Sequence, residues 1–104
     1  MSTEEADTLI TVARVLGWQV DANETIGGVH LEKEVDYSDT PVTLFFEGVK
    51  EINVLPRLIR QRIDDPVNID KGAYPVSELQ EVVAWRLKRA ADLEALACGI
   101  ENMF

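Results

Sequence analysis

The chain has 104 residues, enough for one domain with a single hydrophobic core and too few for two domains of ordinary size. Its apolar fraction of 46% and charged fraction of 28% are those of a globular protein. The formal net charge of −9 argues against direct binding of nucleic acid, because phosphate contacts need a basic surface. We expect a single domain over residues 1–104.

The supply of reactive side chains is small. One cysteine, Cys98, and one histidine, His30, allow no internal disulfide and no zinc site built from several such ligands. No basic leader precedes an apolar segment at the N-terminus, and no apolar run approaches the ~20 residues that a membrane span needs. We expect a cytoplasmic protein with no metal, no cofactor and no membrane contact.

The first predicted element is a helix that begins after a cap at Ser2 or Thr3. Its first turn is acidic, which suits the positive end of the helix dipole. Gly17 ends the helix. Four apolar residues recur before it at helical spacing: Leu9, Val12, Ala13 and Leu16.

Three segments then predict an antiparallel meander. Apolar and polar residues alternate over residues 18–22, and a turn over residues 23–28 leads into the second strand. That strand lies in GGVHLEKEVD, residues 27–36, and the third lies in PVTLFFEG, residues 41–48. Residues 49–54 either add a fourth strand or lead into a helix.

Phe45 and Phe46 are neighbours in the third strand, so their side chains point to opposite faces of the sheet. One of the two rings therefore needs cover from outside the first sheet face. A helix, a second subunit or a binding partner would each provide it.

Two further helices complete the predicted fold. The first starts at Pro56, which a first turn tolerates, and closes before a loop over residues 66–76 that includes a short extended piece at residues 67–69. The second starts at a capping-box pattern opened by Ser77 and stops at Gly99. The sequence thus predicts an α+β fold: an N-terminal helix, an antiparallel meander of three to four strands, and two further helices packed on one face.

The last helix carries apolar residues on more than one side. Trp85, Leu93 and Leu96 fall outside its main apolar stripe. A helix that is apolar on several sides is usually buried in more than one contact, and in so small a chain a second subunit is a natural source of the extra one. We expect a homodimer with these three residues at its interface.

Acidic residues are concentrated in the first half of the chain. Residues 1–55 contain 11 Asp and Glu against 3 Lys and Arg, whereas residues 56–104 contain 8 against 7. Alternation along the second strand places a row of polar residues on one face, and turns or neighbouring strands extend it. The row consists of His30, Glu32, Glu34 and Asp36. The extension consists of Asp21, Asp39 and Glu47.

Two interpretations of this row stay open. A charged sheet face is normal where the face is solvated, and charge protects sheets from edge-to-edge aggregation. Alternatively, the row is a surface for a basic protein partner, with Phe45 or Phe46, or else Trp18 or Trp85, as its apolar anchor.

Motifs that carry chemistry are missing from the sequence. No phosphate-binding or hydrolase motif occurs, and Cys98 at a helix end is disfavoured as a thiolate and reads as a small buried apolar residue. The segment DDPVNIDKG, residues 64–72, offers oxygen ligands at Asp64, Asp65, Asn68 and Asp70 but departs from the calcium-loop pattern. We expect a protein that is not an enzyme.

Two function hypotheses follow. The first is an inhibitor or immunity-type protein, of the kind common in phage and bacterial conflict systems, that docks its acidic sheet face on a basic, nucleic-acid-binding protein. The second rests on element order: helix, three-strand meander, helix, helix is similar to the order in type III secretion chaperones. That resemblance implies a homodimeric chaperone or adaptor whose apolar sheet surface holds an extended client segment.

Overall fold

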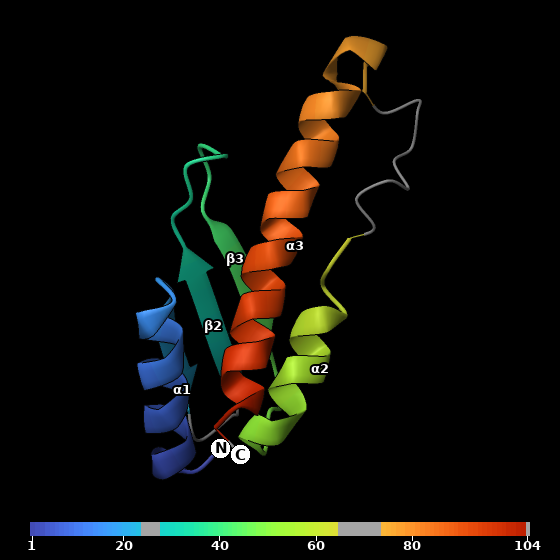
Figure 1. Cartoon of the computed structure of the whole chain (residues 1–104). Helices are drawn as coiled ribbons and strands as arrows, with labels where there is room; N and C mark the ends of the chain where they lie inside the picture. Colours follow the sequence, from blue (N-terminus) through green and yellow to red (C-terminus); the bar gives the residue numbers. More distant parts are fainter. Residues whose placement is uncertain (24–27, 65–73, 104) are drawn as a thin grey trace.

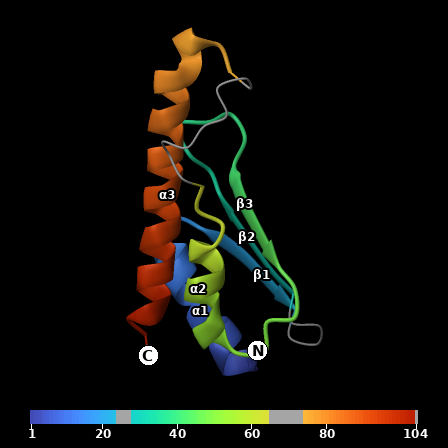
Figure 2. The ribbon, with the colours of Figure 1, turned by 90° about the vertical axis from the view of Figure 1, so that its right-hand side faces the viewer.

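A three-stranded antiparallel sheet and three α-helices make up the part of the chain that the computed structural model describes, residues 1–23, 28–64 and 74–103. The strands lie in the order β1-β2-β3, and the helices pack on one face of the sheet (Figure 1). Figure 2 shows the other face without a described helix over it. The bounds are α1 Thr3–Val15, β1 Gln19–Asn23, β2 Gly28–Lys33, β3 Val42–Phe46, α2 Leu55–Arg60 and α3 Leu79–Glu101. The predicted α+β fold is confirmed.

Helix α1 begins at the predicted cap. The Ser2 hydroxyl accepts a hydrogen bond from the backbone N–H of Glu5, and the Glu5 carboxylate accepts one from the Ser2 backbone N–H, which completes a capping box. The same carboxylate accepts a hydrogen bond of 2.7 Å from the backbone N–H of Ile52. This last bond is the main reason that the pKa of Glu5 is lowered. At the other end of α1, Gly17 turns the chain with φ +87°, a conformation that glycine adopts without strain.

The sheet buries one face, as the alternation predicts. On β3 the buried positions are Val42, Leu44 and Phe46, and on β2 they include Val29 and Leu31. Four fully buried side chains of α3 lie on the helix side of the same core: Leu93, Leu96, Ala97 and Ile100. Trp18, at the start of β1, is also buried in this core.

Residues 49–54 do not form a fourth strand. Ile52–Val54 is a 3-10 turn that runs directly into α2, and Pro56 occupies the first turn of that helix. Val49 and Ile52 are buried, which explains the apolar run that resembles a strand in the sequence. Of the two predicted alternatives, a fourth strand or a lead into a helix, the second is therefore correct.

Helix α3 differs from its predicted limits at both ends. A second 3-10 turn, Val76–Glu78, precedes it, and no side chain caps its N-terminus, so the capping box predicted at Ser77 is not formed. The helix continues through Gly99 to Glu101. Gly99 therefore does not terminate the helix. It marks a close approach instead, because a Cβ atom at this position would lie 3.1 Å from side-chain carbons of both Val12 on α1 and Leu16, which follows that helix.

The two halves of α3 have different surroundings. All its buried residues, Leu93 and Leu96 among them, lie in the C-terminal half, which packs on α1 and α2 and shares one hydrophobic core with the sheet. The N-terminal half rises beyond the strands (Figure 1). This projection gives the molecule its elongated shape, with extents of 48 × 23 × 22 Å.

Several predicted features lie outside the described ranges. They are most of the turn over residues 23–28, most of the loop over residues 66–76 with its extended piece at 67–69, and three of the four oxygen ligands in DDPVNIDKG. Among the described helices, none is at once long enough and apolar enough to span a membrane.

Replacing Gly99 with leucine tests the close approach of α1 and α3. We expect Gly99→Leu to lower the free energy of unfolding by about 1–3 kcal/mol, because the added side chain must displace α1. Urea unfolding followed by circular dichroism measures the loss. Ala95→Leu, at an exposed position of the same helix, is the matched control and should change stability by less than about 0.5 kcal/mol. Equal stability of the two variants would contradict the packing.

Candidate partner-binding surface

The open face of the sheet, here called the outer sheet face, is formed by alternate residues of the three strands. The register places Gln19, Glu32 and Thr43 in one row across β1, β2 and β3. A second row consists of Asp21, His30 and Phe45. These positions alternate with the buried ones, so their side chains point away from the helices. The outer sheet face therefore joins two carboxylates, an imidazole and a phenyl ring.

Phe45 is the large apolar residue of this face, with 48% of its surface exposed. Its neighbour Phe46 points to the core and is 4% exposed, so the two rings do lie on opposite faces as predicted. Arg62 contacts both the backbone and a side chain at this end of β3. Its guanidinium donates a hydrogen bond of 3.3 Å to the carbonyl oxygen of Phe45 and lies 4.9 Å from the ring centroid of Phe46. The exposed ring of Phe45 thus extends from a well-supported strand.

The predicted row of carboxylates is only partly on a strand. Strand β2 ends at Lys33, so Glu34 and Asp36 lie in the connection to β3, and only His30 and Glu32 belong to the strand face. Glu34 nevertheless stays close to the outer sheet face. It lines a shallow hollow of about 180 Å³ together with Glu32, Gln19 and Gly17.

Glu34 also lines a second hollow, of about 290 Å³, with Asp39 and three other residues of the same connection. Glu34 thus lines one hollow with Glu32 and another with Asp39, both near the end of β2. We call these three residues the acidic cluster. Asp36 is exposed nearby but lines neither hollow.

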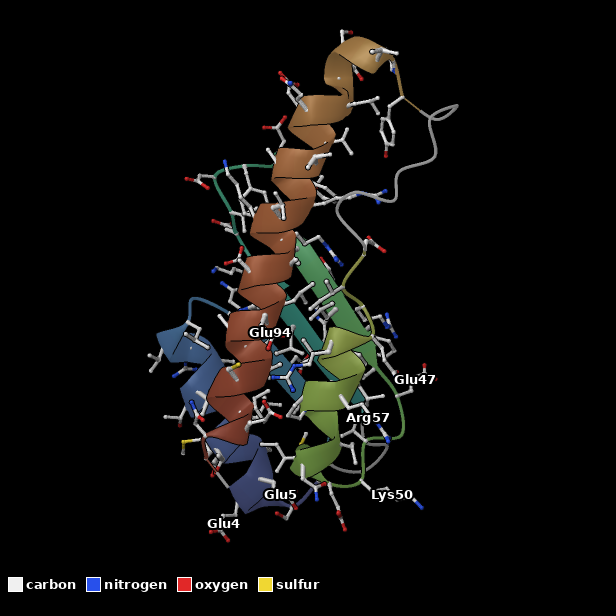
Figure 3. The ribbon with its side chains drawn as sticks, turned by 45° about the vertical axis from the view of Figure 1, so that its right-hand side comes forward. Glu4, Glu5, Glu47, Lys50, Arg57 and Glu94 are labelled. Carbon is white, nitrogen blue, oxygen red and sulfur yellow. The ribbon has the colours of Figure 1, made fainter. Side chains whose placement is uncertain are left out.

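Glu47 is separate from the acidic cluster. It follows Phe46, whose cross-strand partner is Val29, so it lies at the end of the sheet opposite to Asp39. In Figure 3 it projects from the chain just after β3, away from α3. The acidic patch therefore does not extend to this residue.

A polar contact with α3 fixes the connection that carries the acidic cluster. Lys33, the last residue of β2, lies with its ammonium nitrogen 2.7 Å from a carboxylate oxygen of Asp92 on α3. The hydroxyl of Tyr37 donates a hydrogen bond of 2.6 Å to the other oxygen of the same carboxylate. Burial and this hydrogen bond raise the pKa of Tyr37 above its ordinary value. Asp92 thus holds both the start and the middle of the connection.

A second polar cluster joins α2 to α3. The guanidinium of Arg60 contacts the carboxylates of Glu94, at 3.0 Å, and Glu101, at 2.5 Å. The hydrogen bonds that Arg60 donates to Glu94 and Glu101 lower the pKa of both carboxyl groups. The same bonds raise the pKa of Arg60. Glu94 lies on the side of α3 that faces the viewer in Figure 3.

Cys98 belongs to this second cluster and is exposed, so the expectation of a buried cysteine is wrong. Its thiol donates a hydrogen bond of 3.4 Å to Glu94, and Arg60 donates one of 3.5 Å to its sulfur. His30 points away from the helix layer, on the outer sheet face. The structure therefore does not bring the single histidine and the single cysteine together as a base and a nucleophile.

No group of three or more His, Cys, Asp or Glu side chains is arranged to hold a metal ion within residues 1–23, 28–64 and 74–103. Of the oxygen ligands suggested in DDPVNIDKG, Asp64 is exposed and 4.0 Å from Arg89. Asp65, Asn68 and Asp70 lie outside the described residues.

The three residues predicted for a dimer interface are not on one surface. Leu93 and Leu96 are fully buried in the core of the single chain, so they are not accessible to a second subunit. Trp85 is partly buried and lines a hollow of about 370 Å³ with Tyr37, Tyr74 and other residues of α3 and its preceding turn. The apolar excess of α3 is therefore largely used within the chain itself.

Comparison with models of protein families, with curated proteins and with solved structures finds no match for this chain.

Removing the Asp92 carboxylate tests the support of the acidic cluster. We expect Asp92→Ala to lower the free energy of unfolding by about 1–2 kcal/mol, because it leaves Lys33 and Tyr37 without their partner. We also expect faster amide hydrogen exchange over residues 34–41, measured by mass spectrometry. Asp39→Ala, in the same connection, should leave exchange at Tyr37 unchanged. Unaltered exchange in Asp92→Ala would contradict the anchoring role.

The Arg60 cluster predicts a dependence of stability on pH. The pKa values of Glu94 and Glu101 are lower in the folded chain than in the unfolded one. Their contribution to stability is therefore present above about pH 4.5 and is lost as the pH falls through the lowered values. We expect Arg60→Gln to be less stable than the wild type at pH 7, with the difference shrinking toward pH 3.

Denaturant unfolding at several pH values measures this difference. Arg57→Gln, at an exposed position of the same helix, removes the same charge and should show no such trend. A difference for Arg60→Gln that stays constant between pH 7 and pH 3 would contradict the prediction.

Proposed function

We propose that this protein is a small binding protein, not an enzyme, that docks its outer sheet face on a basic protein partner. In this role it acts as an inhibitor or immunity-type protein. The observation that carries the proposal is a ring exposed to water, Phe45, among carboxylates on a sheet face that no described helix covers.

Charge supplies the choice of partner. The chain has a net charge of −9, and Asp21 together with the acidic cluster gives the outer sheet face and its upper rim four carboxylates. Opposite charge speeds association and rejects acidic competitors, while adding less to the final affinity. A basic groove that normally holds nucleic acid is a surface of matching charge.

An apolar contact slows dissociation of the complex. Phe45 is flanked across the strands by His30, and Thr43 shares its side of β3. Burying an aromatic side chain that is half exposed contributes about 1–2 kcal/mol, and such aromatic anchors are typical centres of protein interfaces. Because Arg62 and the β2–β3 pairing hold the strand, little order is lost when Phe45 docks.

The chaperone alternative gains less support from the same surface. Holding an extended client would need an apolar sheet surface, and the outer sheet face has Phe45 as its large apolar side chain among polar ones. Five polar residues surround it: Gln19, Asp21, His30, Glu32 and Thr43. A cytoplasmic location and a phage or bacterial origin belong to the proposal of an inhibitor.

The test is capture from a lysate of the native host with wild-type protein and two variants, read by quantitative mass spectrometry. We expect Glu32→Gln/Glu34→Gln to reduce recovery of basic partners about tenfold at low salt, which corresponds to about 1.4 kcal/mol. The reduction should fade at high salt, where charges are screened. Phe45→Ala should reduce recovery at both salt concentrations, because an apolar contact is not screened.

The matched control for the charge variant is Glu4→Gln/Glu51→Gln, which removes two exposed carboxylates outside the outer sheet face. It should capture the wild-type set of partners. The proposal fails when neither the charge variant nor Phe45→Ala differs from this control.

A further inference from the structure

A hollow of about 370 Å³ lies between the N-terminal half of α3 and the connection that joins β2 to β3. Three aromatic residues line it: Tyr37 from the connection, Tyr74 from the segment before α3, and Trp85 from the helix itself. Hollows of this volume are within the range of ligand sites in proteins. We call this feature the aromatic hollow.

The three rings of the aromatic hollow all retain exposed surface. Tyr74 is 38% exposed, and Tyr37 and Trp85 are partly buried. The face of an aromatic ring carries partial negative charge and attracts cations. Tyr37 makes such a contact within the chain, because the ammonium nitrogen of Lys88 lies 6.0 Å from its ring centroid. The rings therefore favour a cationic ligand.

Two carboxylates favour the same sign of charge. Glu78 and Glu81 line the aromatic hollow, and both are exposed. Spacings of three and four residues place them on the side of α3 that carries Trp85. Within the part of the chain that the structure describes, neither carboxylate lies within ion-pair distance of a lysine or an arginine. The aromatic hollow thus combines ring faces with two carboxylates that its own chain does not neutralise.

We infer that the aromatic hollow binds the guanidinium group of an arginine side chain that a partner protein inserts. A guanidinium is planar and weakly hydrated, so it stacks on ring faces, and its N–H groups form paired hydrogen bonds with carboxylates. Both kinds of group line the hollow. A lysine ammonium is more strongly hydrated and gains less from the rings. A quaternary ammonium has no N–H group to donate to the two glutamates.

The inference deepens the proposed function and rests on it for the class of the partner, a basic protein. Tyr37 lies between Glu34 and Asp39 in one connection, so the aromatic hollow and the acidic cluster share this segment. The hydrogen bond from the Tyr37 hydroxyl to Asp92 holds the ring before a ligand arrives, which lowers the cost of ordering. Arginine is also among the residues that contribute most to protein interfaces.

The test titrates the full chain with an acetylated and amidated tripeptide, glycine-arginine-glycine. Heteronuclear NMR follows the indole N–H signal of Trp85, which Trp85→Phe assigns. We expect a saturable shift with a millimolar Kd. The same tripeptide with citrulline in place of arginine keeps the shape without the charge and should bind at least about tenfold more weakly. No saturable shift with arginine, or equal binding of the citrulline peptide, would overturn the inference.

Two variants separate the contributions of the rings and the carboxylates. Trp85→Leu should raise Kd about fivefold, measured at the backbone amide of Glu81. Glu78→Gln/Glu81→Gln should raise it about threefold at low salt, and the difference should fade at high salt. Circular dichroism shows whether each variant folds. Glu4→Gln/Glu51→Gln removes two exposed carboxylates elsewhere and should leave Kd unchanged. Wild-type Kd values in both hollow variants would contradict the site.

This titration fails separately from the test of the proposed function. Glu32→Gln/Glu34→Gln and Phe45→Ala change the outer sheet face and its rim, so both should bind the arginine peptide like the wild type. A chain that captures basic proteins through those residues but does not bind the peptide would overturn the aromatic hollow alone. A chain that binds the peptide while capture is insensitive to those variants would overturn the docking of the outer sheet face.

Discussion

The inner face of the sheet and the helix layer, which includes the C-terminal half of α3, bury each other, and the other features of the molecule depend on this contact. A sheet of three strands is not stable with an apolar face open to water, so Leu31 and Leu44 need a layer over them. Buried side chains of α1, α2 and α3 supply that layer: Leu9, Leu55, Ile59, Leu93, Leu96 and Ile100. Once α3 is placed there, the outer sheet face becomes the exposed one, and Asp92 comes within reach of the connection that carries the acidic cluster.

The parts of the fold that the sequence predicts correctly are those set by local rules. Alternation with a period of two identifies which residues of β2 and β3 are buried, and it places Phe45 and Phe46 on opposite faces. The cap at Ser2 depends on a residue only three positions away. Residues 49–54 show the limit of such rules, because a buried apolar run has the same composition in a strand as in a turn that leads to a helix.

Most of the predictions that fail concern contacts between distant parts of the chain, and the capping box at Ser77 is a local pattern that fails too. Gly99 reads as a helix stop, and only the approach of α1 shows why a glycine is needed there. The helical spacing of Leu93 and Leu96 indicates burial but not which chain buries them. Asp92 gives no local signal at all, since its partners are 59 and 55 residues away. Thus the strand content of the candidate surface could be predicted, whereas the support of its acidic cluster could not.

A mismatch in length accounts for the exposed half of α3. Strand β2 has six residues and spans about 20 Å, whereas the 23 residues of α3 span about 35 Å. The sheet can therefore cover little more than half of the helix. A helical segment without tertiary contacts is marginal in water, because most helical stability in proteins comes from packing of the apolar side. The apolar stripe at Leu79, Val83 and Leu87 is thus left on the part of α3 that extends past the sheet, where the contacts of Lys88 with Tyr37 and of Arg89 with Arg62 hold the helix to the rest of the chain.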